Sequence, residues 1–208
     1  MMTISVGRKG AGILAALLAL TCATPSIAGP YEDGMDAYKK KNYVLAMKLW
    51  RPLAQDDDVR AQAGVAKLYF AGLGVGKDLR EAVYWGEKAA KRGEPRAQFV
   101  MACLYRDGEG VTKDLARAVE LFQKAADQNH AWAQYSLGLM YNLGEGVPHD
   151  RIMAYKWLSL AGLDREGEDV DVVGPASFVL DKVASKMTPE QIAEAKRRVR
   201  EWKPVQPG

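Results

Sequence analysis

The 208-residue sequence has few of the residues that build disulfide frameworks, metal sites or catalytic centres. It contains two cysteines and two histidines, too few for a disulfide-stapled fold or a four-ligand zinc site. It also lacks an excess of charge, because 29 Lys and Arg face 26 Asp and Glu. This balance excludes nucleic-acid binding that is driven by bulk charge, so no nucleic-acid partner is expected.

Long apolar runs are absent except near the N-terminus. Two basic residues within the first ten precede the uncharged run 11–23, and the small residues Ser26 and Ala28 occupy the −3 and −1 positions before Gly29. The run is shorter than the roughly 20 residues that a membrane-spanning helix needs. This layout predicts a secretory signal peptide, residues 1–28, which is cleaved after Ala28.

Cleavage predicts an exported mature chain, located in the periplasm or secreted. This chain retains only Cys103, so its stability must come from a packed core rather than from an intramolecular disulfide. It has no further run long enough to cross a membrane, which predicts a soluble protein without a transmembrane segment. The alternatives are an uncleaved anchor and a lipoprotein acylated at Cys22, although Thr21 stands where such signals have Gly, Ala or Ser.

Three copies of a 36-residue unit follow one another without a gap, at residues 61–96, 97–132 and 133–168. Tyrosine, glycine, valine, aspartate and alanine recur at fixed positions in all three copies. The matching columns are Tyr69, Tyr105 and Tyr141; Gly72, Gly108 and Gly144; Gly74, Gly110 and Gly146; Val75, Val111 and Val147; Asp78, Asp114 and Asp150; Ala82, Ala118 and Ala154; and Ala89, Ala125 and Ala161. A fixed period of this length indicates a solenoid of stacked repeats.

Each copy has the pattern of two helices joined by a turn. In the first copy, Ala61 and Val65 belong to an apolar stripe at helical spacing. Gly72 is expected to end this helix in the left-handed conformation. Asp78 is expected to cap the second helix, with Glu81 completing a capping box. Because one such pair cannot bury its apolar stripe alone, neighbouring copies must stack.

The repeated pattern A-x-x-x-[LVM]-[GA]-x-x-Y-x-x-G-x-G-V-x-x-D-x-x-x-A resembles that of the Sel-like repeat (SLR) family, which is related to the tetratricopeptide repeat. The resemblance implies an all-α fold, a right-handed α-solenoid of helix-turn-helix repeats. Residues 29–60 resemble a tetratricopeptide unit and are expected to form an N-terminal capping helix pair. Residues 169–203, which include a capping-box pattern at 188–191, are expected to form C-terminal capping helices, and the helix expected at 190–202 resembles the closing helix of many exported bacterial SLR proteins. Residues 204–208 are expected to be a disordered tail.

Motifs that suggest catalysis or ligand binding do not meet the requirements of those sites. The glycine-rich segment 72–77 lacks the first glycine of a phosphate-binding loop, and Asp78 stands where that loop has Ser or Thr. The acidic run 164–171 lacks the glycine and glutamate spacing of a calcium loop. His130 has no Cys, Asp or Glu at ligand spacing. His149 is next to Asp150, but the same repeat position holds Lys77 and Lys113, which favours a solvated loop residue over a catalytic pair. The sequence therefore predicts no catalytic residue, cofactor or metal.

A second stripe on the first helix of each repeat, at repeat positions 3, 7 and 10, is expected to point away from the stack. Together with the glutamine at position 2, it predicts a concave groove in which aromatic rings are flanked by cations and amides. The predicted partner-binding residues are Gln62, Lys67, Phe70, Gln98, Phe99, Arg106, Gln134, Tyr135, Leu139 and Asn142. Packing of Phe99 and Tyr135 on adjacent helices is the alternative that the sequence leaves open.

The SLR resemblance and the lack of a catalytic set predict a non-catalytic exported adaptor or scaffold that binds another protein or peptide through the concave surface. One alternative is a hydrolase that acts on cell-wall-related substrates, as some SLR proteins are reported to do. Those SLR proteins are rich in disulfides, which this chain lacks. A second alternative is a protein that binds peptidoglycan or another glycan by stacking sugars on Tyr and Trp.

Overall fold

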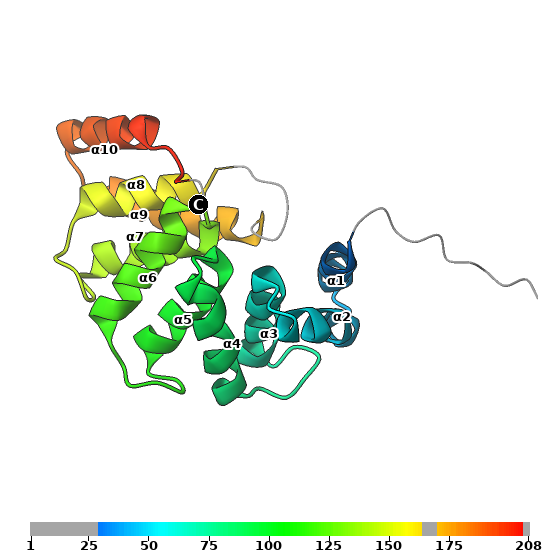
Figure 1. Ribbon diagram of the computed structural model, residues 1–208. Coiled ribbons are helices and arrows are strands. Elements are labelled where there is room, and N and C mark those ends of the chain that lie inside the picture. Colours follow the sequence, from blue (N-terminus) through cyan, green and yellow to red (C-terminus); the bar gives the residue numbers. More distant parts are fainter. Residues whose placement is uncertain (1–28, 164–169, 206–208) are drawn as a thin grey trace, which may run out of the picture.

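The chain forms an α-solenoid, seen in a computed structural model that describes residues 29–163 and 170–205 (Figure 1). Successive helices pack against one another in pairs, and the pairs stack in chain order. The elements are α1 (Pro30–Lys39), α2 (Tyr43–Gln55), α3 (Val59–Ala71), α4 (Leu79–Lys91), α5 (Pro95–Asp107), α6 (Leu115–Asp127), α7 (Ala131–Leu143), α8 (Arg151–Ala161), the 3-10 helix η1 (Val170–Val172), α9 (Val173–Ala184) and α10 (Pro189–Glu201). The predicted all-α solenoid is confirmed. The predicted signal peptide and most of the acidic run lie outside the described residues.

The first helix of each repeat begins two residues before the predicted repeat boundary. Its N-caps are Asp58, Glu94 and His130, whose side chains accept the backbone N–H three residues later at 3.0, 2.9 and 3.2 Å. Glu and His are not among the preferred N-cap residues. Glu94 and His130 therefore give no sequence signal for the start of a helix. His130, expected in the connection between repeats, is therefore the N-cap of α7.

Both glycine columns of the turns adopt the left-handed conformation. Gly108 ends α5 with φ +73°, as predicted for the first column. The second column also brings neighbouring repeats together. A Cβ on Gly74 would lie 2.5 Å from the backbone carbon of Tyr43 at the start of α2, and a Cβ on Gly146 would lie 2.7 Å from the carbonyl oxygen of Leu115 at the start of α6. Each turn therefore packs on the second helix of the preceding repeat.

The start of α4 forms only half of the predicted capping box. The Asp78 carboxylate accepts the backbone N–H of Arg80 and of Glu81, as expected for an N-cap. The Asp78 N–H, however, donates to the Tyr69 carbonyl at 3.1 Å and thereby closes the turn. The Glu81 carboxylate accepts instead from Trp85 Nε1 at 2.9 Å. The capping box predicted at 188–191 is present at the start of α10.

The C-terminal part of the chain folds back over the last complete repeat. Both α9 and α10 contact α8, and α10 lies above α8 in Figure 1. The backbone N–H of Val205 donates to the Asp127 carbonyl at 2.8 Å. The expected disordered tail therefore does not begin at residue 204, because this bond attaches residue 205 to the end of α6.

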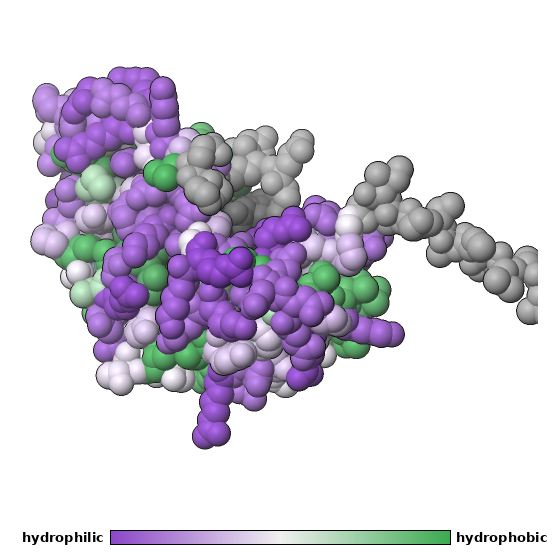
Figure 2. All heavy atoms as spheres, in the orientation of Figure 1, coloured by the Kyte–Doolittle hydropathy of each residue, from purple (hydrophilic) through white to green (hydrophobic). Residues whose placement is uncertain are grey.

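The apolar residues lie mainly between the helices, and the surface in Figure 2 is mostly hydrophilic with small, separate apolar patches. One patch covers the α2 end of the solenoid, where Val44 is 66% exposed. At the same end, Trp50 is buried and fills the space beside Gly34 and Gly64. The two glycines lack a Cβ, which would otherwise collide with the indole ring.

Candidate protein-binding surface

The three glutamines of the predicted groove are buried between repeats. Gln62 and Gln134 donate from Nε2 to the carbonyls of Ala54 and Ala126, at 3.1 and 3.0 Å. Both carbonyls lie in the last turn of the preceding helix, where the helix itself leaves carbonyl groups without partners. The expectation that these three amides line an open groove is corrected by their burial, and in Gln62 and Gln134 the amide donor serves the preceding helix.

The other predicted residues lie along one stripe of each first helix, and all of them are half-buried. The stripe does not point away from the stack, because it borders the following repeat. Ala63, in the same column as Phe99, is fully buried against Ala97 of the next first helix. The stripe residues identified from the sequence are Lys67 and Phe70 on α3, Phe99 and Arg106 on α5, and Tyr135, Leu139 and Asn142 on α7.

The rings of Phe99 and Tyr135 pack on adjacent helices with part of each side chain still exposed. Phe99 stacks on His130 with ring centroids 4.9 Å apart, and it lies 5.8 Å from the Phe122 ring of α6. Tyr135 packs against a cluster of α8 and α9 residues and meets Trp132 edge-on at 5.8 Å. These contacts match the alternative that the sequence left open, in which the two rings stabilise the stack.

The cations of the stripe are oriented by neighbouring side chains. Arg106 donates two hydrogen bonds to the Asp107 carboxylate, both at 2.8 Å, and this pairing holds the pKa of Asp107 below its usual value. The Lys67 ammonium lies 4.6 Å from the centroid of the Tyr38 ring. The positions of both cations are therefore restricted by contacts within the chain.

Three further residues extend the stripe toward the N-termini of the first helices, and the sequence analysis missed them. Arg60, Arg96 and Trp132 share one column of the 36-residue period, three residues before the column of Phe99. The Arg60 guanidinium lies 4.1 Å from the centroid of the Tyr31 ring, and Arg96 donates to the Tyr31 hydroxyl. The column was overlooked because the predicted repeats began two residues late. The first-helix stripe comprises Arg60, Lys67, Phe70, Arg96, Phe99, Arg106, Trp132, Tyr135, Leu139 and Asn142.

Paired helices, glycine turns and stacking in chain order define an α-solenoid repeat protein. The family model of the Sel1 repeat matches residues 28–58, 59–94, 95–130 and 133–163, more than half of the chain. The chain belongs to the Sel1 repeat family. The N-terminal pair, which the sequence analysis compared with a tetratricopeptide unit, is itself matched as a Sel1 repeat.

Two solved structures show the same architecture. One is c5321, a protective antigen of uropathogenic Escherichia coli with an SLR fold, at TM-score 0.70 and 29% identity over 83% of this chain and 37% of that chain. The other is a Sel1 repeat protein from Oxalobacter formigenes, at TM-score 0.56 and 28% identity over 81% of this chain and 74% of that chain. The chain thus spans little more than a third of the length of c5321. No curated protein matches it.

Sel1 repeat proteins generally act as scaffolds for protein–protein interactions. Within residues 29–163 and 170–205, no group of three His, Cys, Asp or Glu side chains is arranged to hold a metal ion. In the same part of the chain, no helix combines the length and the apolar character that crossing a membrane requires. The first-helix stripe is accordingly the surface on which a functional proposal is built.

Proposed function

We propose that the protein is a non-catalytic exported adaptor that binds an extended segment of another protein along the first-helix stripe. The observation that carries the proposal is the recurrence of this stripe at 36-residue intervals on α3, α5 and α7. Helix α3 packs on α5, and equivalent positions recur at regular intervals along a solenoid, so we expect one bound segment to reach side chains from more than one first helix. Aromatic residues and arginine are also the types that contribute most to binding at protein interfaces.

The charge of the stripe changes along the solenoid, and this change indicates the chemistry of the segment that would bind to it. On α3 and α5 it carries the cations Arg60, Lys67, Arg96 and Arg106, whereas on α7 it carries Trp132 and other apolar or neutral side chains. The matching segment is acidic where it crosses α3 and α5 and apolar where it crosses α7. Charge complementarity of this kind favours orientation and specificity as well as affinity.

Export is the second part of the proposal and rests on the signal-peptide pattern of residues 1–28. Mass spectrometry of the exported protein should show a chain that begins at Gly29. A retained segment 1–28 or a lipid on Cys22 contradicts this part. The two rival functions are tested separately, hydrolysis by an activity screen on cell-wall substrates and glycan binding by co-sedimentation with sacculi.

The binding surface is tested by reversing charge on the stripe. Arg60→Glu combined with Arg106→Glu should reduce capture of the protein's envelope partner by about tenfold or more, because a contact between opposite charges becomes one between like charges. Both side chains are partly solvent-accessible, and their surface ion pairs contribute at most about 1 kcal/mol to stability. Arg60 also lies over the Tyr31 ring, a contact that contributes about 0.5–1 kcal/mol at an exposed site. The fold should therefore survive the change, as circular dichroism and a thermal melt will show.

The matched control is Arg51→Glu combined with Arg80→Glu. These exposed arginines lie on the second helices α2 and α4, so the control makes the same change of net charge away from the stripe. Capture of the partner should be retained in the control. Equal capture by the two double variants, with both folded, would show that the first-helix stripe is not the binding surface.

A further inference from the structure

One position of the second helices differs between repeats in a way that changes the packing. At intervals of 36 residues, α4 has Trp85, α6 has Leu121 and α8 has Trp157. Trp85 packs into the core formed by α1, α2 and α3, and Trp157 packs into the core next to α6 and α7. The middle repeat lacks the large ring that fills this place in its neighbours.

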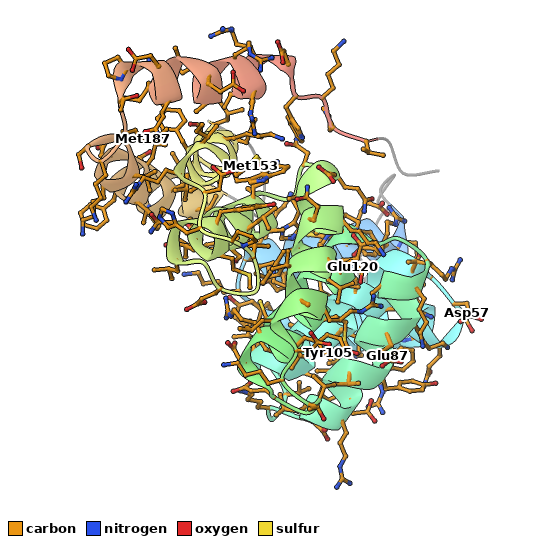
Figure 3. All side chains as sticks on the ribbon, turned by 90° about the vertical axis from the view of Figure 1, so that its left-hand side faces the viewer. Asp57, Glu87, Tyr105, Glu120, Met153 and Met187 are labelled. Atoms are coloured by element: carbon orange, nitrogen blue, oxygen red, sulfur yellow. The ribbon has the colours of Figure 1, made fainter. Side chains whose placement is uncertain are left out.

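A cavity of about 410 Å³ lies at this place, between α4 and α6 and above α5. Its apolar lining includes Met101, Leu121 and the half-buried ring of Tyr105. Tyr105 and Glu87, which both line the cavity, lie close to each other in Figure 3, with Glu120 on α6 nearby. The volume falls within the range of pockets that hold small molecules. The cavity is lined by α4, α5 and α6, and none of its lining residues belongs to the first-helix stripe.

The rim of the cavity carries more positive than negative charge. Lys91, Arg117 and Lys124 line it, against the carboxylate of Glu87 in the lining and that of Glu120, which pairs with both Arg117 and Lys124. Each cation is held by an ion pair within its own helix and near the surface, such as Lys91 with Glu87 at 2.8 Å. Exposed pairs of this kind contribute little to stability, so the three cations are able to turn toward an anionic group in the cavity.

Gln98 adds a hydrogen-bonding group to the lining. It is only 4% exposed, and its side-chain oxygen accepts from Gln128 Nε2 at 2.9 Å. The equivalent Gln62 and Gln134 donate to carbonyls of the preceding helix, but the Gln98 amide nitrogen donates to no acceptor among the described residues. The Gln98 amide therefore places a hydrogen-bonding group at the wall of the cavity.

We propose that this cavity binds an aromatic carboxylate. The ring occupies the place that the indole side chains fill in the neighbouring repeats, between Leu121 and Tyr105. The carboxylate lies at the rim within reach of Arg117 and Lys124, and guanidinium and ammonium groups form strong, charge-assisted hydrogen bonds with such a group. A free aromatic acid and the C-terminal aromatic residue of a peptide share this chemistry.

Indole-3-acetate is the probe, titrated into the isotope-labelled full chain and followed by NMR. Saturable shifts are expected at the Gln98 side-chain amide and at the backbone of Tyr105. Indole-3-acetamide, which has the same ring without the charge, should bind about tenfold more weakly, as expected for the loss of hydrogen bonds to a charged group. N-acetyltryptophan tests the peptide source: binding tighter than that of indole-3-acetate assigns the site to a C-terminal residue, and weaker binding assigns it to a free acid.

Leu121→Trp is the decisive variant, because it restores the residue that the neighbouring repeats have and fills the cavity. It should abolish binding, whereas Tyr84→Trp, at an exposed position of α4, should leave the Kd unchanged. Arg117→Gln combined with Lys124→Gln keeps the core intact and should weaken indole-3-acetate about tenfold, but not the acetamide. The absence of saturable shifts, or an unchanged Kd in Leu121→Trp, overturns the site. Equal affinities for acid and amide overturn the assignment to a carboxylate.

Discussion

Gly74→Ala should destabilise the chain far more than Gly76→Ala, although both glycines lie in the turn between α3 and α4. Gly74 has φ +69°, and an added Cβ would lie 2.5 Å from the backbone carbon of Tyr43 and 2.6 Å from the backbone nitrogen of Val44. The neighbouring atoms belong to the backbone at the start of α2, so no flexible side chain can move aside. Gly76 has nothing within 4 Å of an added Cβ and does not have a positive φ.

The magnitude follows from separate contributions. A residue with a Cβ in the left-handed region costs about 1–2 kcal/mol, and forcing an extra methyl group into a packed contact costs about 1–3 kcal/mol. Replacing glycine by alanine restricts the unfolded chain, which offsets about 0.4–1 kcal/mol of this. The expected loss in the free energy of unfolding for Gly74→Ala is about 2–4 kcal/mol. Gly76→Ala should be neutral or more stable by up to about 1 kcal/mol.

Gly93→Ala separates backbone strain from the collision. Gly93 has φ +85° but nothing within 4 Å of an added Cβ. Only the strain and the unfolded-state contribution therefore apply, and the expected loss is about 0.5–1.5 kcal/mol. The three variants should fall in the order Gly76→Ala, Gly93→Ala and Gly74→Ala from most to least stable.

Urea unfolding followed by circular dichroism measures the three variants against the parent chain. The transition midpoint should change while the slope stays constant, because the surface exposed on unfolding is the same. In thermal melts, 1 kcal/mol corresponds to about 2–4 °C for a chain of this size. If Gly74→Ala and Gly93→Ala lose the same stability, the inferred contact between the turn and α2 is wrong. If Gly74→Ala is as stable as Gly76→Ala, the positive φ is wrong as well.

Three further predictions concern other parts of the chain. Met153→Glu should raise the Tm, with an expected gain of about 1 kcal/mol in the free energy of unfolding. Trp157 Nε1 is a buried donor without an acceptor in the described residues. At the equivalent positions of the first repeat, Glu81 accepts from Trp85 Nε1 at 2.9 Å. Burial raises the pKa of the Cys103 thiol to about 12, so at pH 8 the thiol is protonated and iodoacetamide should label it only in urea, as peptide mass mapping will show. Thr188→Ala should cost about 1 kcal/mol in urea melts, because its hydroxyl accepts the Gln191 N–H at the start of α10; an unchanged midpoint would show that this cap does not contribute to stability.

The sequence by itself determined the repeat architecture, because the signals for that architecture are local. A fixed 36-residue period, apolar stripes at helical spacing and the cap at Asp78 predict helix pairs from a few neighbouring residues at a time. The left-handed conformation at Gly72 follows from the backbone freedom of glycine alone. These features do not depend on which helix lies next to which.

Only the tertiary structure decided what each face of a helix contacts. A glutamine that recurs at one repeat position is equally compatible with two roles: it can face a ligand, or it can bind the last carbonyls of the preceding helix. The Gln62 amide could be assigned only once the Ala54 carbonyl was seen 3.1 Å away. The cavity at Leu121 has the same origin: a smaller residue opens a space only if no neighbouring helix moves in to fill it. Such outcomes depend on residues far apart in the chain, and periodicity carries no information about those contacts.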